Sequence, residues 1–380
     1  MAGSLRQRGE DSWELRVHAG RDETTGAKRY VTRTVRGRRR AAELALAKLV
    51  TEVEEGSVSA RNGTVRELCD RWFEYASPGL SPTVAPEYRR ILDQRVLPKF
   101  GSTPLRRLRT SELDTWYAML SQNGGQRGQP LAANSVHRIH AVLRRALNQG
   151  VKWGWIAINP AAAATPPKLH RISISVPSAQ EIGELIHRAT EVNPGLPVFL
   201  RLAAISGARR GEMCSIRWRH IDFDAGALHI QNAIIMVAGK TIEKDTKTHA
   251  ERRMRLDQRT LEVLRDYRSL LDSIVPAPEQ HRRDMYVFSH DPEGQIPWRP
   301  DYVTTAFGRL ARQQQLDGLR LHDLRHFSAT TMLANGVDIR TASGRLGHAN
   351  TSTTLDVYSH FVKAADDRAA DTLASIIDAL

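Results

Sequence analysis

The chain has 380 residues, of which 41% are hydrophobic, and its 55 Lys and Arg against 42 Asp and Glu give a formal net charge of +13. This length favours two or three globular domains, and this charge favours a polyanionic partner such as nucleic acid, although other basic proteins share it. No stretch holds the ~18 uninterrupted apolar residues of a membrane span, and Cys69 and Cys214 lie far apart in segments with helical patterning. We therefore expect an intracellular protein with no membrane span, no disulfide framework and no cysteine-based zinc site.

The first fifty-odd residues predict a small sheet followed by one helix. Residues 13–17 and 28–35 alternate apolar and polar side chains, and residues 23–26 between them are typical of a turn. From Arg38 the apolar residues follow helical spacing, and the helix should end at Gly56. Its apolar face carries Ala42, Ala45, Leu49 and Val53. Such a sheet suits a DNA groove, and a basic appendage with a solvated face is the alternative.

A second, helical segment follows the polar run 57–63. Thr64 and Glu67 form a capping box that opens a helix. The apolar face of this helix carries Val65, Leu68, Trp72 and Tyr75. Further helices are expected over residues 86–97, 111–121 and 132–150, with breaks at 98–101 and 123–130. The Ala- and Pro-rich run 159–167, with residues 168–175, predicts an interdomain linker.

The last helix of this segment places positive charge on its exterior. The residues concerned are Arg138, Arg144, Arg145 and Lys152. A solvated charged face is the alternative for any one of them, but the excess of one sign favours contacts with DNA phosphates.

From Ser178 onward the chain predicts a mainly helical domain with a β interlude over residues 227–256. Near its start, Gly207 allows a sharp turn into a helix, and Glu212 returns to the face of Arg209, which it can orient. An ordinary surface ion pair is the alternative.

An apolar strand over 233–238 and a turn at Gly239-Lys240 predict a β-hairpin. We expect its tip to be crowded with Lys244, Lys247, Arg252, Arg253 and Arg255. So many like charges favour an anionic partner, with Arg252 as a DNA contact. Lys247 can protonate a leaving oxygen if neighbouring cations lower its pKa, and a plain phosphate contact is the alternative.

Histidines and arginines gather further on. His322 and Arg325 share a helix face, Asp323 can fix a neighbouring side chain, and His348 and Tyr358 follow. Because paired carboxylates and thiolates are missing beside these histidines, we expect no metal site. We expect packing or secondary phosphate contacts for His326 and His360.

These motifs together resemble the tyrosine recombinase (phage integrase) family. Five segments stand in that family's order, namely 206–212, 246–248, 322–326, 346–348 and 358–360. Residues 64–164 resemble the family's helical core-binding domain, and the first 55 residues resemble the arm-binding sheet of phage and conjugative-element integrases. The resemblance implies a mainly α, multi-domain protein. Its parts would be an arm-type DNA-binding domain (1–56, a three-stranded sheet plus helix), a SAM-like core-binding domain (64–165) and a mixed α+β catalytic domain with a β-hairpin (173–380).

The resemblance also implies a catalytic set, which comprises Arg209, Lys247, His322, Arg325, His348 and Tyr358. Tyr358 would form a 3′-phosphotyrosyl intermediate while the two arginines bind the non-bridging oxygens of the phosphate. Lys247 would protonate the departing 5′ oxygen, and the histidines would take the tyrosine proton or bind the phosphate. Glu212 and Asp323 would support this set. The covalent link conserves the bond energy, so no cofactor is expected.

The expected partners are double-stranded DNA attachment sites, a homotetramer that synapses them through a Holliday junction, and a host bending protein or directionality factor. A final amphipathic helix over residues 364–380 would dock onto a neighbouring protomer or pack in cis. We expect a cytoplasmic, nucleoid-associated bacterial protein that integrates or excises a mobile element. The alternatives are a chromosome-dimer resolvase, a type IB topoisomerase-like relaxing enzyme and a DNA-binding regulator with an inactive site.

Overall fold

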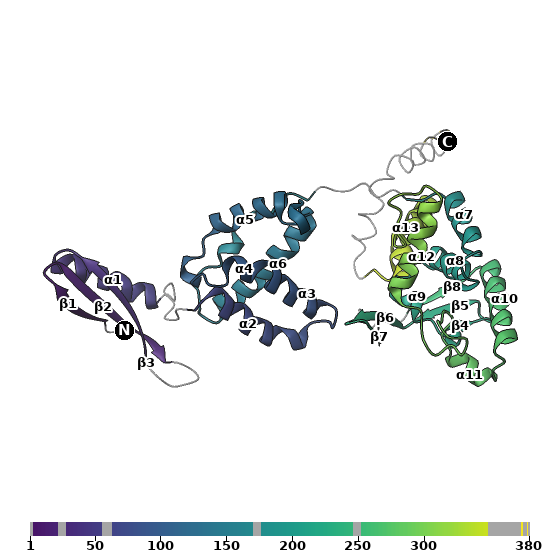
Figure 1. The fold of residues 1–380 in the computed structure, drawn as a ribbon, viewed down its shortest axis with the longest axis horizontal. Helices are drawn as coiled ribbons and strands as arrows, with labels where there is room; N and C mark the ends of the chain where they lie inside the picture. Colours follow the sequence, from purple (N-terminus) through teal and green to yellow (C-terminus); the bar gives the residue numbers. More distant parts are fainter. Residues whose placement is uncertain are drawn as a thin grey trace. The chain divides into compact units, whose positions relative to one another are not determined.

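The computed structural model describes residues 3–21, 28–54, 63–169, 176–245 and 252–348, with the single positions 374 and 378. The chain divides into two compact units, residues 1–171 and 172–380 (Figure 1). Within the described part of the first unit, the N-terminal sheet and the helices that follow it each have their own buried apolar cluster. The second unit is built on a further, larger cluster.

The chain opens with an antiparallel sheet in the order β1 (Gly3–Gly9), β2 (Ser12–Arg21), β3 (Lys28–Arg36). Helix α1 (Arg39–Glu54) packs against one face of it. The core between them holds Leu15 and Val17 from β2 with Ala42, Leu49 and Val53 from α1. The expected three-stranded sheet backed by a helix is therefore confirmed, while the turn at 23–26 and the end at Gly56 lie outside the described residues.

The helical part of the first unit contains α2 (Val65–Ala76), α3 (Val84–Ile91), a π-turn (Leu92–Val96), α4 (Leu97–Phe100), α5 (Thr110–Asn123) and α6 (Ala133–Lys152). Thr64 caps α2 as expected, because its N–H donates to Glu67 Oε2 at 2.8 Å and its Oγ1 accepts from Glu67 N–H at 3.3 Å. The assignment of Tyr75 to the apolar face is wrong. Its side chain is 66% exposed and meets Trp153 edge-on.

Two other expectations for this unit are also wrong. The helical backbone runs through Pro98, because this residue occupies the first turn of α4, where a backbone N–H is not needed. The first part of the expected linker, residues 159–167, belongs to the helical core instead, since Ala161 and Ala164 are small enough to enter it. Thr110 Oγ1 also donates to the carbonyl of Pro160 at 2.9 Å, which ties this run to α5. The division between the two units falls after Arg171, within the second part of that linker, residues 168–175.

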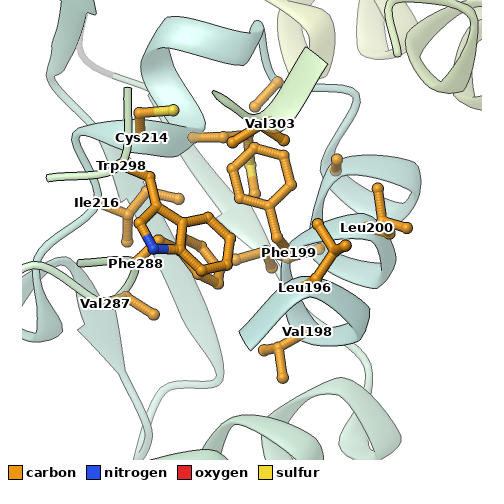
Figure 2. Packing of buried hydrophobic residues seen from close by; sticks show 14 of the residues in the cluster. Leu196, Val198, Phe199, Leu200, Cys214, Ile216, Val287, Phe288, Trp298 and Val303 are labelled. Carbon is orange, nitrogen blue, oxygen red and sulfur yellow. The ribbon is translucent and has the colours of Figure 1, made fainter. Parts of the chain in front are cut away.

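The second unit forms around α8 (Gly195–Ser206), which is apolar on most of its surface and buried accordingly. Helices α7 (Ala179–Ala189), α10 (Gln258–Ile274) and α13 (Asp323–Ala334) pack against it. The described residues of this unit also form α9 (Arg210–Cys214), α11 (Glu279–Asp284), α12 (Pro300–Gln313) and α14 (Ile339–Leu346). Figure 2 shows the aromatic centre of this core, where the ring centroid of Phe288 lies 5.0 Å from that of Phe199 and 5.4 Å from that of Trp298.

The β interlude of this unit forms two small sheets. Strands β4 (Ile221–Asp222), β5 (Ala227–Ile230) and β8 (Arg252–Arg255) pair in that order, and β6 (Asn232–Val237) pairs with β7 (Lys240–Asp245). The hairpin turn lies at Ala238-Gly239, with φ of 49° and 80°. The expected crowd of cations at the hairpin tip is wrong, because Lys244 lies at the far end of β7 and Arg252 begins β8, which pairs with β5.

Candidate active site

Gly207 connects α8 to the short helix α9 and brings Arg209 into place. Its φ of +60° is a left-handed conformation that glycine adopts without strain. A Cβ atom at Gly207 would also lie 2.4 Å from Leu346 Cδ2, so the turn requires a residue without a side chain. The expectation of a sharp glycine turn before Arg209 is confirmed.

Arg209 stands at the N-terminus of α9, and its side chain is 46% exposed. Its backbone N–H donates to Glu212 Oε2 at 2.7 Å and its Nη1 donates to Glu212 Oε1 at 2.9 Å. Nη2 donates to the carbonyl oxygen of Gly347 at 3.0 Å. Glu212 therefore orients Arg209 in the structure, and this guanidinium keeps a face toward solvent.

The carboxylate of Glu212 is buried and holds a second arginine. Arg252 Nη1 donates to Oε1 at 3.2 Å and Arg252 Nη2 donates to Oε2 at 2.5 Å. Burial alone would raise the pKa of Glu212, but the hydrogen bonds and charges of Arg252 and Arg209 outweigh it and lower this pKa. Glu212 is therefore an anion at neutral pH. The side chain of Arg252, which the sequence suggested as a DNA contact, is only 10% exposed.

Arg325 lies in the first turn of α13 and is 4% exposed. Its Nη1 donates to the carbonyl oxygens of Gly207 at 2.6 Å and Leu346 at 2.7 Å. Its Nη2 is buried and has no hydrogen-bond partner among the described residues. Burial, together with the charge of Arg209, lowers the pKa of Arg325 to about 9, which still leaves the guanidinium charged at neutral pH.

Two histidines belong to the same neighbourhood. His322 precedes α13 and meets His326 edge-on, with ring centroids 5.0 Å apart. Desolvation and the charges of His326 and Arg325 lower the pKa of His322 to about 4, although the residue as a whole is exposed. Desolvation and the charges of Arg325 and Arg209 likewise lower the pKa of His348 to about 4. Both imidazoles are thus neutral at pH 7 and able to accept a proton.

Asp323 is buried, and its described partner is Arg320. The Arg320 backbone N–H donates to Asp323 Oδ2 at 2.7 Å, and Arg320 Nη2 donates to Oδ1 at 3.2 Å. This carboxylate therefore fixes the entry into α13, and through it the start of the helix that carries Arg325.

Four of the predicted side chains lie together around the turn at Leu346-Gly347. They belong to Arg209, Glu212, Arg252 and Arg325. A Cβ atom at Gly347 would lie 2.5 Å from Arg252 Nη1, so this guanidinium packs directly against the turn. Lys247 and Tyr358, the other two members of the expected set, lie outside the described residues, as do His360 and all but two positions of the expected helix 364–380.

An ionic cluster that the sequence pattern does not predict anchors β7. Arg217 Nη2 donates to Glu243 Oε2 at 2.9 Å and to the Tyr286 hydroxyl at 2.6 Å, and this hydroxyl donates to Glu243 Oε2 at 2.5 Å. Partial burial and the adjacent carboxylate raise the pKa of Tyr286 to about 12. These residues are 26 to 69 positions apart in sequence, so local spacing gives no signal for the cluster.

The cationic face of α6 belongs to the first unit. Arg138 pairs with Glu87 at 2.9 Å, and Arg145 donates to the hydroxyl of Tyr88. Arg144 and Lys152 are exposed. Within the described ranges, no group of His, Cys, Asp and Glu is arranged to hold a metal ion, and no helix is long and apolar enough to cross a membrane.

Family models match segments in each of the two units. Residues 178–364 match the Phage integrase family, and residues 64–121 match the phage integrase N-terminal SAM-like domain. A tyrosine recombinase XerC of Xanthomonas axonopodis pv. citri is 30% identical over 233 residues, which cover 60% of this chain and 68% of that protein. The chain belongs to the phage integrase family. It is therefore a tyrosine-type site-specific DNA recombinase.

Two further similarities extend along most of the chain. The ICEBs1 integrase of Bacillus subtilis is 22% identical over 377 residues, covering 98% of this chain and 100% of that protein. The crystal structure of a lambda integrase tetramer bound to a Holliday junction superposes with a TM-score of 0.60 at 19% identity, over 93% of this chain and 94% of that one. The mainly helical recombinase fold expected from the sequence is thus confirmed.

Proposed function

We propose that the protein is a mobile-element integrase that cuts and rejoins DNA attachment sites through a 3′-phosphotyrosyl intermediate on Tyr358. The observation that carries this proposal is the pair of guanidiniums of Arg209 and Arg325. The Arg209 guanidinium keeps a face toward solvent. Arg325 holds a buried Nη2 for which the described residues supply no acceptor. A buried cationic donor without an acceptor is costly, and the non-bridging oxygens of a phosphodiester would satisfy it.

The proposed reaction exchanges one phosphoester for another. The Tyr358 hydroxyl passes its proton to His322 and attacks the scissile phosphorus, the bond from phosphorus to the 5′ oxygen breaks, and Lys247 gives that oxygen a proton. Arg209 and Arg325 stabilise the charge that develops on the non-bridging oxygens. The 5′ hydroxyl of a partner duplex then gives its proton to Lys247 and attacks the phosphotyrosine. This attack restores a phosphodiester, and His322 returns its proton to the released oxygen of Tyr358. Neither water nor a cofactor is consumed.

The low pKa values of His322 and His348 support their proposed roles. A neutral imidazole at His322 can take the proton of Tyr358, whereas a protonated one could not. The charges of both arginines act on His348, and we propose that it donates a hydrogen bond to a phosphate oxygen or to the nucleophile.

We further propose three functional domains, over residues 1–56, 64–165 and 173–380. In the first, Arg16 lies over the ring of Tyr30, 3.8 Å from its centroid, on the sheet face opposite the apolar side chains that pack on α1. In the second, Arg138, Arg144, Arg145 and Lys152 offer charge to DNA phosphates. These surfaces support site selection, which a recombinase needs in addition to its chemistry.

We propose that four protomers assemble on two attachment sites in the cytoplasm, at the nucleoid, with a host bending protein or a directionality factor setting the outcome. The similarity to a lambda integrase that forms a tetramer on a Holliday junction supports this assembly.

The test uses a genomic DNA library built into nicked suicide substrates, which trap the covalent intermediate because the cut fragment diffuses away. We expect wild-type protein to yield protein–DNA junctions that recur at one DNA sequence, and peptide mapping to place the DNA end on Tyr358. Tyr358→Phe should bind the same DNA and form no adduct. Adducts that persist in this variant would refute the nucleophile, and scattered junctions would refute site selection.

A further inference from the structure

We propose that Arg252 is a positioning residue that acts on the scissile phosphate through Glu212 and Arg209. The inference rests on the proposed function, in which Arg209 binds a non-bridging oxygen. Arg252 would not contact DNA itself. It would hold the Glu212 carboxylate so that Arg209 keeps both its orientation and its positive charge at the phosphate.

The geometry of the carboxylate supports this role. Glu212 Oε1 accepts from Arg209 Nη1 at 2.9 Å and from Arg252 Nη1 at 3.2 Å, while Oε2 accepts from Arg209 N–H at 2.7 Å and from Arg252 Nη2 at 2.5 Å. Each carboxylate oxygen of Glu212 therefore accepts one hydrogen bond from Arg252 and one from Arg209. The carboxylate cannot rotate without breaking bonds to both arginines.

The charge balance of this group supports it as well. A single arginine beside a buried carboxylate forms a neutral pair, which would attract a phosphate only weakly. Two arginines on one carboxylate leave a net charge of +1, and the exposed member is Arg209. The buried arginine thus balances Glu212, and the charge of Arg209 stays available to the anionic substrate.

The position of Arg252 on β8 distinguishes it from the exposed cations of the same strand. In β8 the side chains of Arg252 and Met254 turn toward the protein, whereas those of Arg253 and Arg255 are exposed. The Arg252 guanidinium also packs against Gly347, whose carbonyl oxygen accepts from Arg209 Nη2. The same side chain therefore supports Arg209 from two sides, through Glu212 and through the turn.

The experiment compares single-turnover cleavage by wild type, Arg252→Ala, Arg252→Lys and Arg259→Ala on a DNA site obtained from the junction sequencing. We expect Arg252→Ala to keep DNA affinity within about twofold and to cleave about 10–100-fold more slowly, as is typical when a supporting partner is lost. Arg252→Lys should fall between, because one ammonium cannot span both carboxylate oxygens. Arg259→Ala, which removes an exposed Arg–Glu pair on α10, should cleave like wild type.

Two further measurements separate positioning from general damage to the fold. Glu212→Gln added to Arg252→Ala removes the unbalanced carboxylate, so the double variant should cleave faster than Arg252→Ala alone. A methylphosphonate at the scissile position lacks one negative oxygen, so it should reduce the defect of Arg252→Ala. A fold defect would reduce cleavage of both substrates equally and would not be relieved by Glu212→Gln.

The outcomes distinguish this inference from the proposed function on which it rests. Arg209→Ala, measured in parallel, should be strongly impaired on the phosphate and relieved by the methylphosphonate. If Arg209→Ala cleaves normally, the proposed function fails at that residue. If Arg209→Ala behaves as expected but Arg252→Ala cleaves like wild type, the role of Arg252 is refuted. The role is also refuted if neither the methylphosphonate nor Glu212→Gln relieves the defect of Arg252→Ala. Weakened DNA binding with unchanged cleavage at saturation would instead make Arg252 a DNA contact.

Discussion

Arg325 Nη1 donates to the carbonyl oxygen of Leu346 at 2.7 Å, and so joins the first turn of α13 to the last residue of α14. The same nitrogen donates to Gly207 at the end of α8. One guanidinium therefore serves both the packing of three helices and the proposed chemistry, through Nη1 and Nη2 respectively. Substitutions here should change stability and catalysis together.

Arg325→Lys should lose catalysis by a larger factor than stability. An ammonium can replace one of the two carbonyl contacts, but it cannot also present a second nitrogen to the phosphate. We expect cleavage to fall about 10²–10³-fold and the free energy of unfolding to fall by about 1–3 kcal/mol. Single-turnover cleavage and urea denaturation measure the two effects. Wild-type cleavage by this variant would show that Nη2 is not needed for the reaction.

Gly207→Ala tests the close approach of α8 to Leu346. The added Cβ would enter a left-handed backbone position and collide with the Leu346 side chain at 2.4 Å. Gly336→Ala is the matched control, because its φ is +80° and a Cβ there meets nothing within 4 Å. The control should lose about 1–2 kcal/mol from backbone strain alone, and Gly207→Ala should lose at least ~1 kcal/mol more from overpacking. Equal losses would mean that the contact with Leu346 relaxes freely.

The depressed pKa values of His322 and His348 predict the pH dependence of the free protein. Both rings should stay neutral down to about pH 5, and both should titrate near pH 4. NMR titration of the imidazole C–H signals, assigned with His322→Gln and His348→Gln, measures this. A midpoint near 6.5 for either ring would show that burial and the neighbouring charges do not lower its pKa.

The same shifts affect stability. Each pKa is lower in the folded state than the ~6.5 of an unfolded chain, so the unfolded state binds protons first as the pH falls. The contribution of these rings is therefore fully present above pH 6.5 and is lost as the pH falls from 6.5 toward 4. In urea denaturation, His322→Gln should flatten this acid limb, and an unchanged slope would show that His322 does not cause it.

Glu243→Ala should loosen the attachment of β7 to the body of the second unit. The substitution leaves the Arg217 guanidinium and the Tyr286 hydroxyl without their shared carboxylate, at a cost of about 1–3 kcal/mol. Thr241→Ala, at an exposed position of the same strand, should change stability by less than about 0.5 kcal/mol. Thermal denaturation compares the two variants, and equal melting temperatures would show that the cluster does not anchor the strand.

Lys247→Ala tests the proposed general acid. Replacement of the scissile 5′ oxygen by sulfur supplies a leaving group that needs no proton, so this substrate should restore most of the lost cleavage rate. Tyr358→Phe should gain nothing from the sulfur. A Lys247→Ala defect that persists on the sulfur substrate would assign the lysine to phosphate binding instead.

Local motifs were predicted well from the sequence because their partners lie within one turn of a helix. The Thr64–Glu67 capping box, the turn at Gly207 and the pairing of Glu212 with Arg209 are all of this kind. Residues whose role depends on a distant partner were not predictable in the same way. The spacing around Arg252 gave no sign that it pairs with Glu212, 40 positions earlier.

The errors have the same physical origin. The cations of β7 and β8 were expected at a hairpin tip because charge density along a sequence does not reveal which strand pairs with which. The Ala and Pro content around Ala161 is typical of a linker, but small side chains also fit into a helical core. In both cases the place of the residues depends on contacts with residues that are distant in the sequence.

Arginines from α9, β8 and α13 meet at the two-residue turn Leu346-Gly347, which comes immediately before His348 and, ten residues later, Tyr358. A change at this turn would disturb all three arginines at once, including the two that we propose to bind the scissile phosphate. Engineering that aims to redirect the enzyme to new DNA sites should therefore vary the exposed cations of the first unit, which we propose to contact DNA, and leave Leu346-Gly347 unchanged.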